Sequence, residues 1–158
     1  MEIRFAKPKD ALQILALLEE IGQVHYRIRP DMFQSNAQKY GASQVLARLA
    51  NPETPTFVAV EGEKVLGYSF CELKNFDRHP VMADHKEMFL EDLCVHRDAR
   101  RLGVGKALYN HVCDYARKQG CHNLTLHVWS DNAGAVKFYE EMGMKPQRYI
   151  METILEEK

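Results

Sequence analysis

The sequence lacks three features that would narrow its function at once: a paired-cysteine motif, an excess of charge of one sign, and a long hydrophobic run. The 158 residues include 4 cysteines, none in the C-x-x-C spacing typical of a structural zinc site. The 21 lysine and arginine residues nearly balance 22 acidic ones, which argues against nucleic-acid binding through bulk positive charge. No stretch approaches the roughly 20 apolar residues of a membrane span.

These absences favour a cytoplasmic protein without a metal centre, a membrane contact or a nucleic-acid partner. Unpaired cysteines are typical of a reducing compartment. The start M-E-I-R-F shows neither the basic region nor the apolar run of a signal peptide. A chain of 158 residues forms one ordinary domain, so we expect a single domain over residues 1–158.

Hydrophobic periodicity predicts an α/β (α+β) fold with a mixed, mostly antiparallel sheet flanked by helices. Strands are expected at 2–6, 56–60, 64–73, 88–95, 124–129 and 144–155, the last as one strand or a broken pair. Helices are expected from Asp10 to Gly22 or onward to Arg29, at 39–50, from 104 to Gly120, and from Ser130 to Gly143. Residues 61–63 suit a hairpin turn, and residues 75–86 a polar loop.

A glycine-rich basic turn lies between the strand at 88–95 and the next helix. It reads Arg100, Arg101, Leu102, Gly103, Val104, Gly105 and Lys106. Unpaired backbone N–H groups and the helix dipole make such a turn an anion site, and glycine lets a phosphate approach the backbone.

Three phosphate-binding motifs can be compared with this turn. A P-loop would read G-x-x-x-x-G-K-S/T, but Ala107 follows Lys106 and no glycine stands at position 100. A dinucleotide-binding fingerprint needs glycine or alanine where Leu108 stands, so that reading is weak. The pattern R-x-x-G-x-G of acetyl-coenzyme A (acetyl-CoA) enzymes fits Arg100, Gly103 and Gly105.

At these residues the chain resembles the GNAT superfamily of N-acetyltransferases. The run V-H-R-D-A-R-R-L-G-V-G-K-A-L is similar to one signature of the superfamily, and N-A-G-A-V-K-F-Y-E-E-M-G-M to a second. Arg101 departs from the glycine that many members carry. The resemblance implies a single-domain GNAT fold that uses acetyl-CoA as co-substrate and no metal. It also implies a homodimer, and we expect the two chains to contact each other through the last strand.

The resemblance also implies which residues hold acetyl-CoA. Backbone amides from Leu102 to Lys106 would bind the pyrophosphate. Leu93 and Val95 would offer backbone groups to the pantetheine arm where their strand splays from its neighbour. Asn132 would bond the pantetheine region, and it is equally typical of a plain helix start.

Acetyl transfer to an amine requires a route for protons. Deprotonating an aliphatic ammonium at pH 7 costs roughly 4.6 kcal/mol, so the site should supply a base and an acid for the leaving thiolate. Glu91 and Asp92 interrupt an apolar strand, on opposite faces if the strand alternates regularly. Burial would raise the pKa of Glu91 toward neutrality, which suits a base acting directly or through water. For Asp92 we expect a structural salt bridge.

Tyr139 is the candidate acid, because a phenol with a pKa near 10 can donate to a departing thiolate. The Phe138-Tyr139 pair matches the tyrosine position of the superfamily, although helices also bury aromatic stripes. Cys94 could in principle carry an acetyl group, but a buried strand role is the simpler interpretation. His111 and His127 are assigned to packing or to the surface.

The acceptor is the least defined part of the function. The L-E-D sequence at residues 90–92 looks like the spermidine and diamine acetyltransferase branch. Amino acids and protein amines stay open as acceptors. The alternative to an enzyme is a non-catalytic acetyl-CoA-binding sensor, which would need the basic turn but not Glu91 and Tyr139 together.

Overall fold

The computed structural model describes residues 1–155 and divides the chain into two compact units, 1–127 and 128 onward. The first unit contains five strands: β1 (Glu2–Phe5), β2 (Thr56–Glu61), β3 (Lys64–Asn75), β4 (Lys86–Val95) and β5 (Asn123–Leu126). Its helices are η1 (Pro8–Asp10), α1 (Ala11–Ile28), α2 (Ala42–Ala50), η2 (Arg97–Ala99) and α3 (Val104–Lys118). The second unit contains α4 (Ala133–Glu141).

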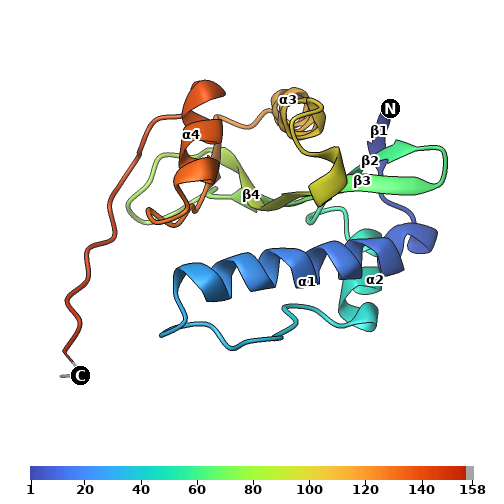
Figure 1. Ribbon diagram of the computed structural model, residues 1–158. Coiled ribbons are helices and arrows are strands. Elements are labelled where there is room, and N and C mark those ends of the chain that lie inside the picture. The colour runs from blue at the N-terminus through green and yellow to red at the C-terminus, as the bar shows by residue number, and fades with distance from the viewer. Residues whose placement is uncertain (156–158) are drawn as a thin grey trace. The chain divides into compact units, whose positions relative to one another are not determined.

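The five strands form one sheet in the order β1-β2-β3-β4-β5. The pairs from β1 to β4 are antiparallel, and β4 pairs with β5 in parallel. Helices α1 and α2 cover one face of the sheet and α3 covers the other (Figure 1). The predicted mixed, mostly antiparallel α/β fold is confirmed.

Both faces of the sheet are buried because helices cover each of them. Residues 56–60 of β2 are all buried, as expected of a strand between two covered faces. On the α3 face, Phe57 packs its ring against Tyr115 and His111, with ring centroids 5.1 and 4.7 Å apart. On the opposite face, α1 and α2 bury Ile14, Leu18 and Val45 against Tyr68 and Phe70.

Helix α1 does not end at Gly22 but continues to Ile28. Gly22 lies inside the helix where the following linker crosses it: a Cβ atom there would stand 3.2 Å from the carbonyl oxygen of Ala37. The side chain of Gln23 also donates a hydrogen bond of 3.0 Å to Asn36. The linker of residues 29–41 is therefore held against α1, and α2 begins only at Ala42 instead of residue 39.

The strand expected at residues 144–155 is not present in this structure. A strand needs a hydrogen-bonded neighbour, and the described part of the second unit contains no strand to supply one. Large apolar side chains of this segment are exposed: Tyr149, Ile150, Met151, Ile154 and Leu155. Likewise β5 ends at Leu126, three residues earlier than the predicted Trp129.

Helix α4 starts later than predicted. Its N-cap is Asn132, whose side-chain oxygen accepts a 3.2 Å hydrogen bond from the backbone N–H of Ala135, so Ser130 and Asp131 lie outside the helix. At its other end, Gly143 follows the C-cap Met142 with φ of 87°, the left-handed conformation that favours glycine. The helix therefore ends at Glu141, and Gly143 stands one residue beyond the C-cap instead of being the predicted C-cap itself.

Candidate active site

Strands β4 and β5 separate halfway along β4. They pair only where Glu87–Leu90 faces Asn123–Leu126, so Glu91–Val95 extends beyond the paired part. The N–H of His96 donates to Leu66 of β3 at 2.8 Å, and backbone direction alternates along a strand. The backbone groups of Leu93 and Val95 therefore point away from β3, toward the side on which β5 no longer pairs.

The turn after β4 leads into an uncapped helix N-terminus. Gly103 is the N-cap of α3 with φ of 82°, and Arg101 also has a positive φ of 62°. Among residues 1–155, no side chain caps α3 by accepting a hydrogen bond from the N–H groups of its first turn. The N–H groups of Val104, Gly105 and Lys106 are thus left as donors, at the positive end of the helix dipole.

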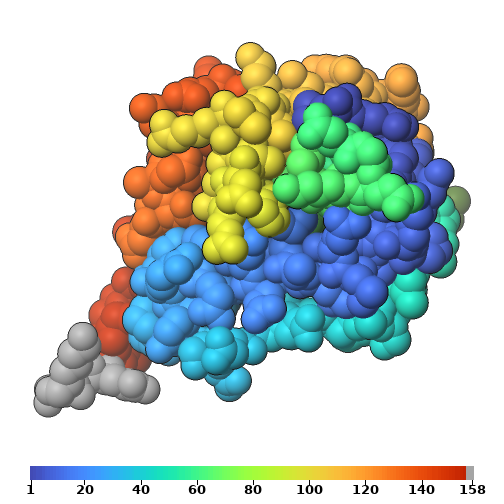
Figure 2. Space-filling view, turned by 45° about the vertical axis from the view of Figure 1, so that its right-hand side comes forward, coloured from blue at the N-terminus to red at the C-terminus, as the bar shows by residue number. Residues whose placement is uncertain are grey.

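The basic side chains of this turn are not all alike. Arg100, Arg101 and Lys106 are all exposed. Arg100 differs in having partners: its Nε donates to the carbonyl oxygen of Val95 at 3.2 Å, and its Nη2 lies 3.8 Å from Glu20. In the space-filling view the start of α3 (yellow) adjoins the β2–β3 turn (green), where Leu102 and Val104 line a hollow of about 270 Å³ (Figure 2).

A β-bulge at Glu91 changes which way the β4 side chains face. Leu90 pairs with Cys71 and Asp92 pairs with Phe70, so Glu91 is an extra residue without a partner in β3. The regular alternation predicted for this strand is therefore wrong at this point. Leu90 shares a face with Cys71, whereas Asp92 and Cys94 share the opposite face with Phe70, on the side of α1 and α2.

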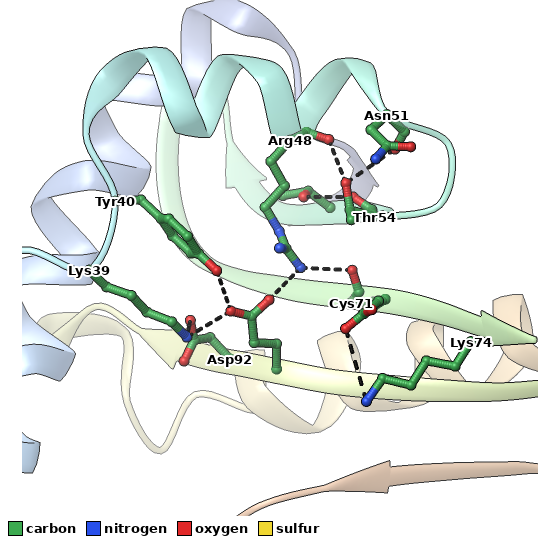
Figure 3. Close-up of polar contacts among 11 residues, drawn as sticks. Lys39, Tyr40, Arg48, Asn51, Thr54, Cys71, Lys74 and Asp92 are labelled. Carbon is green, nitrogen blue, oxygen red and sulfur yellow. Dashed lines mark hydrogen bonds and ion pairs between the residues drawn. The ribbon is translucent and has the colours of Figure 1, made fainter.

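The bulge brings Glu91 into a cluster of polar residues from α2 and the linker. One carboxylate oxygen accepts hydrogen bonds from the Tyr40 hydroxyl at 2.5 Å and from Lys39 Nζ at 2.9 Å. The other lies 2.7 Å from Arg48 Nη2. Figure 3 shows Lys39, Tyr40 and Arg48 converging beside Asp92.

These contacts lower the pKa of Glu91, opposite to the direction predicted from burial alone. Burial is the largest single influence and raises the pKa, but the hydrogen bonds from Tyr40 and Lys39 and the charge of Arg48 together outweigh it. Glu91 is therefore ionised at neutral pH. A carboxylate of this kind can orient an ammonium group or a water molecule, and it is a weak base.

Asp92 makes the salt bridge that the sequence predicted. Its carboxylate lies 2.8 Å from Lys39 Nζ, and its side chain is only 4% exposed. Burial raises the pKa of Asp92 despite this partner. Burial by itself would lower the pKa of Lys39, but Asp92 and Glu91 outweigh burial and hold that pKa above its ordinary value.

Sequence reasoning did not identify Lys39, Tyr40 or Arg48. The two acidic residues in an apolar strand were a signal that cationic partners exist, because buried carboxylates need them. The partners lie on the linker and on α2, and Lys39 is 53 positions from Asp92. No local pattern marks them, so only the packing of α2 on the sheet brings them together.

The structure favours the buried role for Cys94. Its thiol donates a 3.5 Å hydrogen bond to the carbonyl oxygen of Leu17, and burial raises its pKa to about 12. A protonated thiol is a poor nucleophile. His111 and His127 pack against Phe57 and Phe89, with ring centroids 4.7 and 5.0 Å apart.

Two predicted site residues belong to the second unit. The rings of Tyr139 and Phe138 on α4 contact each other edge to face, with centroids 5.1 Å apart. Asn132 uses its side-chain oxygen to cap α4, which is the helix-start role that its position also suggested.

Over residues 1–155, no three His, Cys, Asp or Glu side chains form a group able to hold a metal ion. No described helix combines the length and hydrophobicity needed to span a bilayer.

Replacing Arg48 with methionine should destabilise the protein by about 2 kcal/mol at pH 7. The variant loses the ion pair to Glu91 and the 2.8 Å hydrogen bond to the carbonyl oxygen of Cys71. The ionised Glu91 carboxylate contributes to the free energy of unfolding above its unfolded pKa of about 4.3. This contribution is lost as pH falls through the lower pKa of the folded state. The difference between wild type and Arg48→Met should therefore shrink below about pH 4.

Urea unfolding from pH 3 to pH 7 measures this difference. Arg117→Met is the matched control, since its ion pair with Asp114 is exposed, and it should cost less than about 0.5 kcal/mol. A loss in Arg48→Met that is equal at every pH would contradict the assigned role of the pair.

Known proteins with similar sequences and structures are acetyltransferases or share their fold. The sequence model of the Acetyltransferase (GNAT) family matches residues 19–144. The chain is 32% identical over 91 residues to the [Ribosomal protein bS18]-alanine N-acetyltransferase of Escherichia coli, covering 56% of this chain and 60% of that enzyme. It is 32% identical over 91 residues to the streptothricin acetyltransferase of Streptomyces lavendulae, covering 58% and 44%. The matched stretch thus spans less than two thirds of these relatives.

The structure also superposes on a mutant of the BH1408 protein of Bacillus halodurans with a TM-score of 0.93 and 28% identity, covering 98% of this chain and 99% of that one. The family match covers most of the chain and both predicted signatures. The chain belongs to the Acetyltransferase (GNAT) family.

Proposed function

We propose that this protein transfers an acetyl group from acetyl-CoA to a primary amine by direct attack in a ternary complex, with residues 1–158 acting as one catalytic domain. The observation that supports this most is the stretch from Leu93 to Lys106. It combines unpaired strand backbone with an uncapped helix N-terminus within a short piece of chain. Acetyl-CoA needs both kinds of group: N–H donors for its phosphates, and strand backbone groups to pair with the amides of its arm.

The proposed cofactor contacts follow from that stretch. The N–H groups from Leu102 to Lys106 bind the pyrophosphate, and Arg101 and Lys106 add charge. The outward backbone groups of Leu93 and Val95 pair with the amides of the pantetheine arm. Arg100 joins the pyrophosphate site only if it leaves Val95 and Glu20, and its departure would also free the Val95 carbonyl oxygen. The side-chain oxygen of Asn132 caps α4, and we propose that its side-chain NH2 group contacts the pantetheine arm.

Glu91 and Tyr139 are the proposed catalytic residues. Because Glu91 is held ionised, it accepts a hydrogen bond from a water that takes the proton of the acceptor ammonium and passes it to solvent. The neutral amine then attacks the thioester carbonyl carbon, and the C–S bond breaks as Tyr139 gives its proton to the departing sulfur. The attacking nitrogen becomes cationic when the C–N bond forms and gives its surplus proton to the Tyr139 phenolate, which restores the phenol.

Two lines of support favour an enzyme over a non-catalytic acetyl-CoA sensor. The chain belongs to an acetyltransferase family, and it carries both proposed catalytic residues.

For the acceptor, the relatives point to different amines: the name of the Escherichia coli enzyme gives a protein alanine, and that of the Streptomyces lavendulae enzyme gives streptothricin. The assignment of a diamine or polyamine as acceptor rests on the L-E-D sequence at residues 90–92 alone. We propose a primary amine of a diamine, amino acid or protein.

Replacing Tyr139 with phenylalanine should lower kcat at least tenfold and leave the Kd for acetyl-CoA within threefold of wild type. The variant keeps the ring but loses the proton donor. Thiol release with acetyl-CoA over a panel of diamines, amino acids and peptides first identifies the acceptor. Tyr149→Phe, an exposed phenol, is the control and should leave kcat unchanged. Wild-type turnover in Tyr139→Phe would refute the role of Tyr139, and absence of thiol release with every amine would favour the sensor.

Two glycines flank α3 and offer a matched pair of variants for the pyrophosphate site. Gly103 has φ of 82° and Gly120 has φ of 73°, and at each an added Cβ would meet no atom within 4 Å. Alanine at either position therefore carries similar backbone strain. Gly103→Ala should weaken acetyl-CoA binding at least tenfold by calorimetry, and Gly120→Ala less than twofold. Equal effects in the two variants would contradict the proposed site.

We also propose a cytoplasmic homodimer that contacts its partner through residues 144–155. The exposed apolar side chains from Tyr149 to Leu155 support an interface there, and the unpaired cysteines support a reducing compartment. Sedimentation equilibrium should give two chains for the wild type and one for Ile150→Asp. Val81→Asp, which alters an exposed loop residue, should stay dimeric. A monomeric wild type would refute the dimer.

A further inference from the structure

The ammonium group of Lys39 lies between two carboxylates. Its Nζ atom lies 2.9 Å from Glu91 and 2.8 Å from Asp92, bridging two carboxylates of consecutive residues (Figure 3). Consecutive residues of a regular strand point to opposite faces, so the bulge at Glu91 is what allows one cation to contact both.

The two carboxylates depend on Lys39 to different degrees. Glu91 keeps Arg48 and Tyr40 as partners when Lys39 is removed. For Asp92, Lys39 is the one hydrogen-bond donor to its carboxylate among the residues that the structure describes. His25 also lies near Asp92, but burial lowers the pKa of His25, so it is mostly neutral at pH 7. Removing Lys39 therefore leaves a buried carboxylate without a cation, which is unfavourable unless another cation or a proton binds it.

Lys39 belongs to the linker of residues 29–41 and not to a helix or strand, so movement of its side chain breaks no backbone hydrogen bond of a helix or strand. The linker stays anchored on either side by the hydrogen bonds of Asn36 to Gln23 and of Tyr40 to Glu91. The Lys39 side chain is 42% exposed, whereas that of Asp92 is 4% exposed. Rotation of four side-chain bonds moves the ammonium into solvent and opens the carboxylate pair.

We propose that Lys39 determines acceptor specificity by occupying the ammonium site of Glu91 and Asp92. An acceptor with a second ammonium group must compete with Lys39 for this site, whereas an acceptor with one amine and an uncharged tail need not. The wild-type enzyme therefore discriminates against diamines, and loss of the Lys39 charge removes that discrimination. This inference rests on the proposed function for its catalytic consequence, but the ammonium site itself can be tested by binding.

Calorimetry on the full chain tests the site with 1,4-diaminobutane, and 1,4-butanediol serves as an uncharged probe of the same length. Lys39→Met should bind the diamine at least tenfold more tightly than the wild type, with no change for the diol. Lys39→Arg keeps the charge and should behave as the wild type. Lys9→Met is the matched control, because Lys9 pairs with Glu63 on the exposed surface. If Lys39→Met does not fold, Lys39→Gln retains a hydrogen-bond donor to Asp92 without the charge.

The kinetic test compares kcat/KM for 1,4-diaminobutane with that for 4-amino-1-butanol. Their ratio should rise at least tenfold in Lys39→Met and stay constant in Lys39→Arg. If a folded variant without the lysine charge gains no affinity for the diamine, the inference is wrong even when acetyl transfer proceeds. If the diamine binds as expected but no amine releases thiol from acetyl-CoA, the ammonium site stands and the proposed function fails.

Discussion

One extra residue in β4 controls the geometry of the whole candidate site. With Glu91 unpaired opposite β3, the strand bends and its side-chain pattern shifts, so that Leu90 faces α3 while Asp92 and Cys94 face α1 and α2. The same region marks the end of the pairing between β4 and β5 at Leu90. A single backbone irregularity thus coincides with the exposed strand edge and with the adjacent pair of carboxylates.

The carboxylate pair requires cations, and the fold supplies them from two separate elements. Arg48 comes from α2 and Lys39 from the linker, and both would be costly to bury without the acidic residues of β4. The resulting cluster joins linker, helix and strand in a nearly neutral group. It also keeps Glu91 ionised, so its chemistry is that of a fixed negative charge and not of a base with a pKa near 7.

Several elements could be predicted because their signals are local. The alternation and apolar content of residues 64–73, and the apolar stripe of α3 between two glycines, need no information from elsewhere in the chain. The predictions failed where distant groups decide the outcome. The helix predicted over residues 39–50 begins only at Ala42, and Lys39 and Tyr40 lie instead in the linker, where they contact Asp92 and Glu91. Residues 144–155 have a strand-like composition, yet a strand requires a neighbour to pair with.

The sequence by itself determined the fold class, the glycine-rich basic turn from Arg100 to Lys106 and the presence of two costly acids in an apolar strand. Each of these follows from residue types at short spacing, where backbone geometry links pattern to structure directly. Only the tertiary structure decided the direction of the Glu91 pKa shift and the identity of its partners Lys39, Tyr40 and Arg48. A pKa depends on the charges and hydrogen bonds within a few ångströms, and those come from residues about 50 positions away.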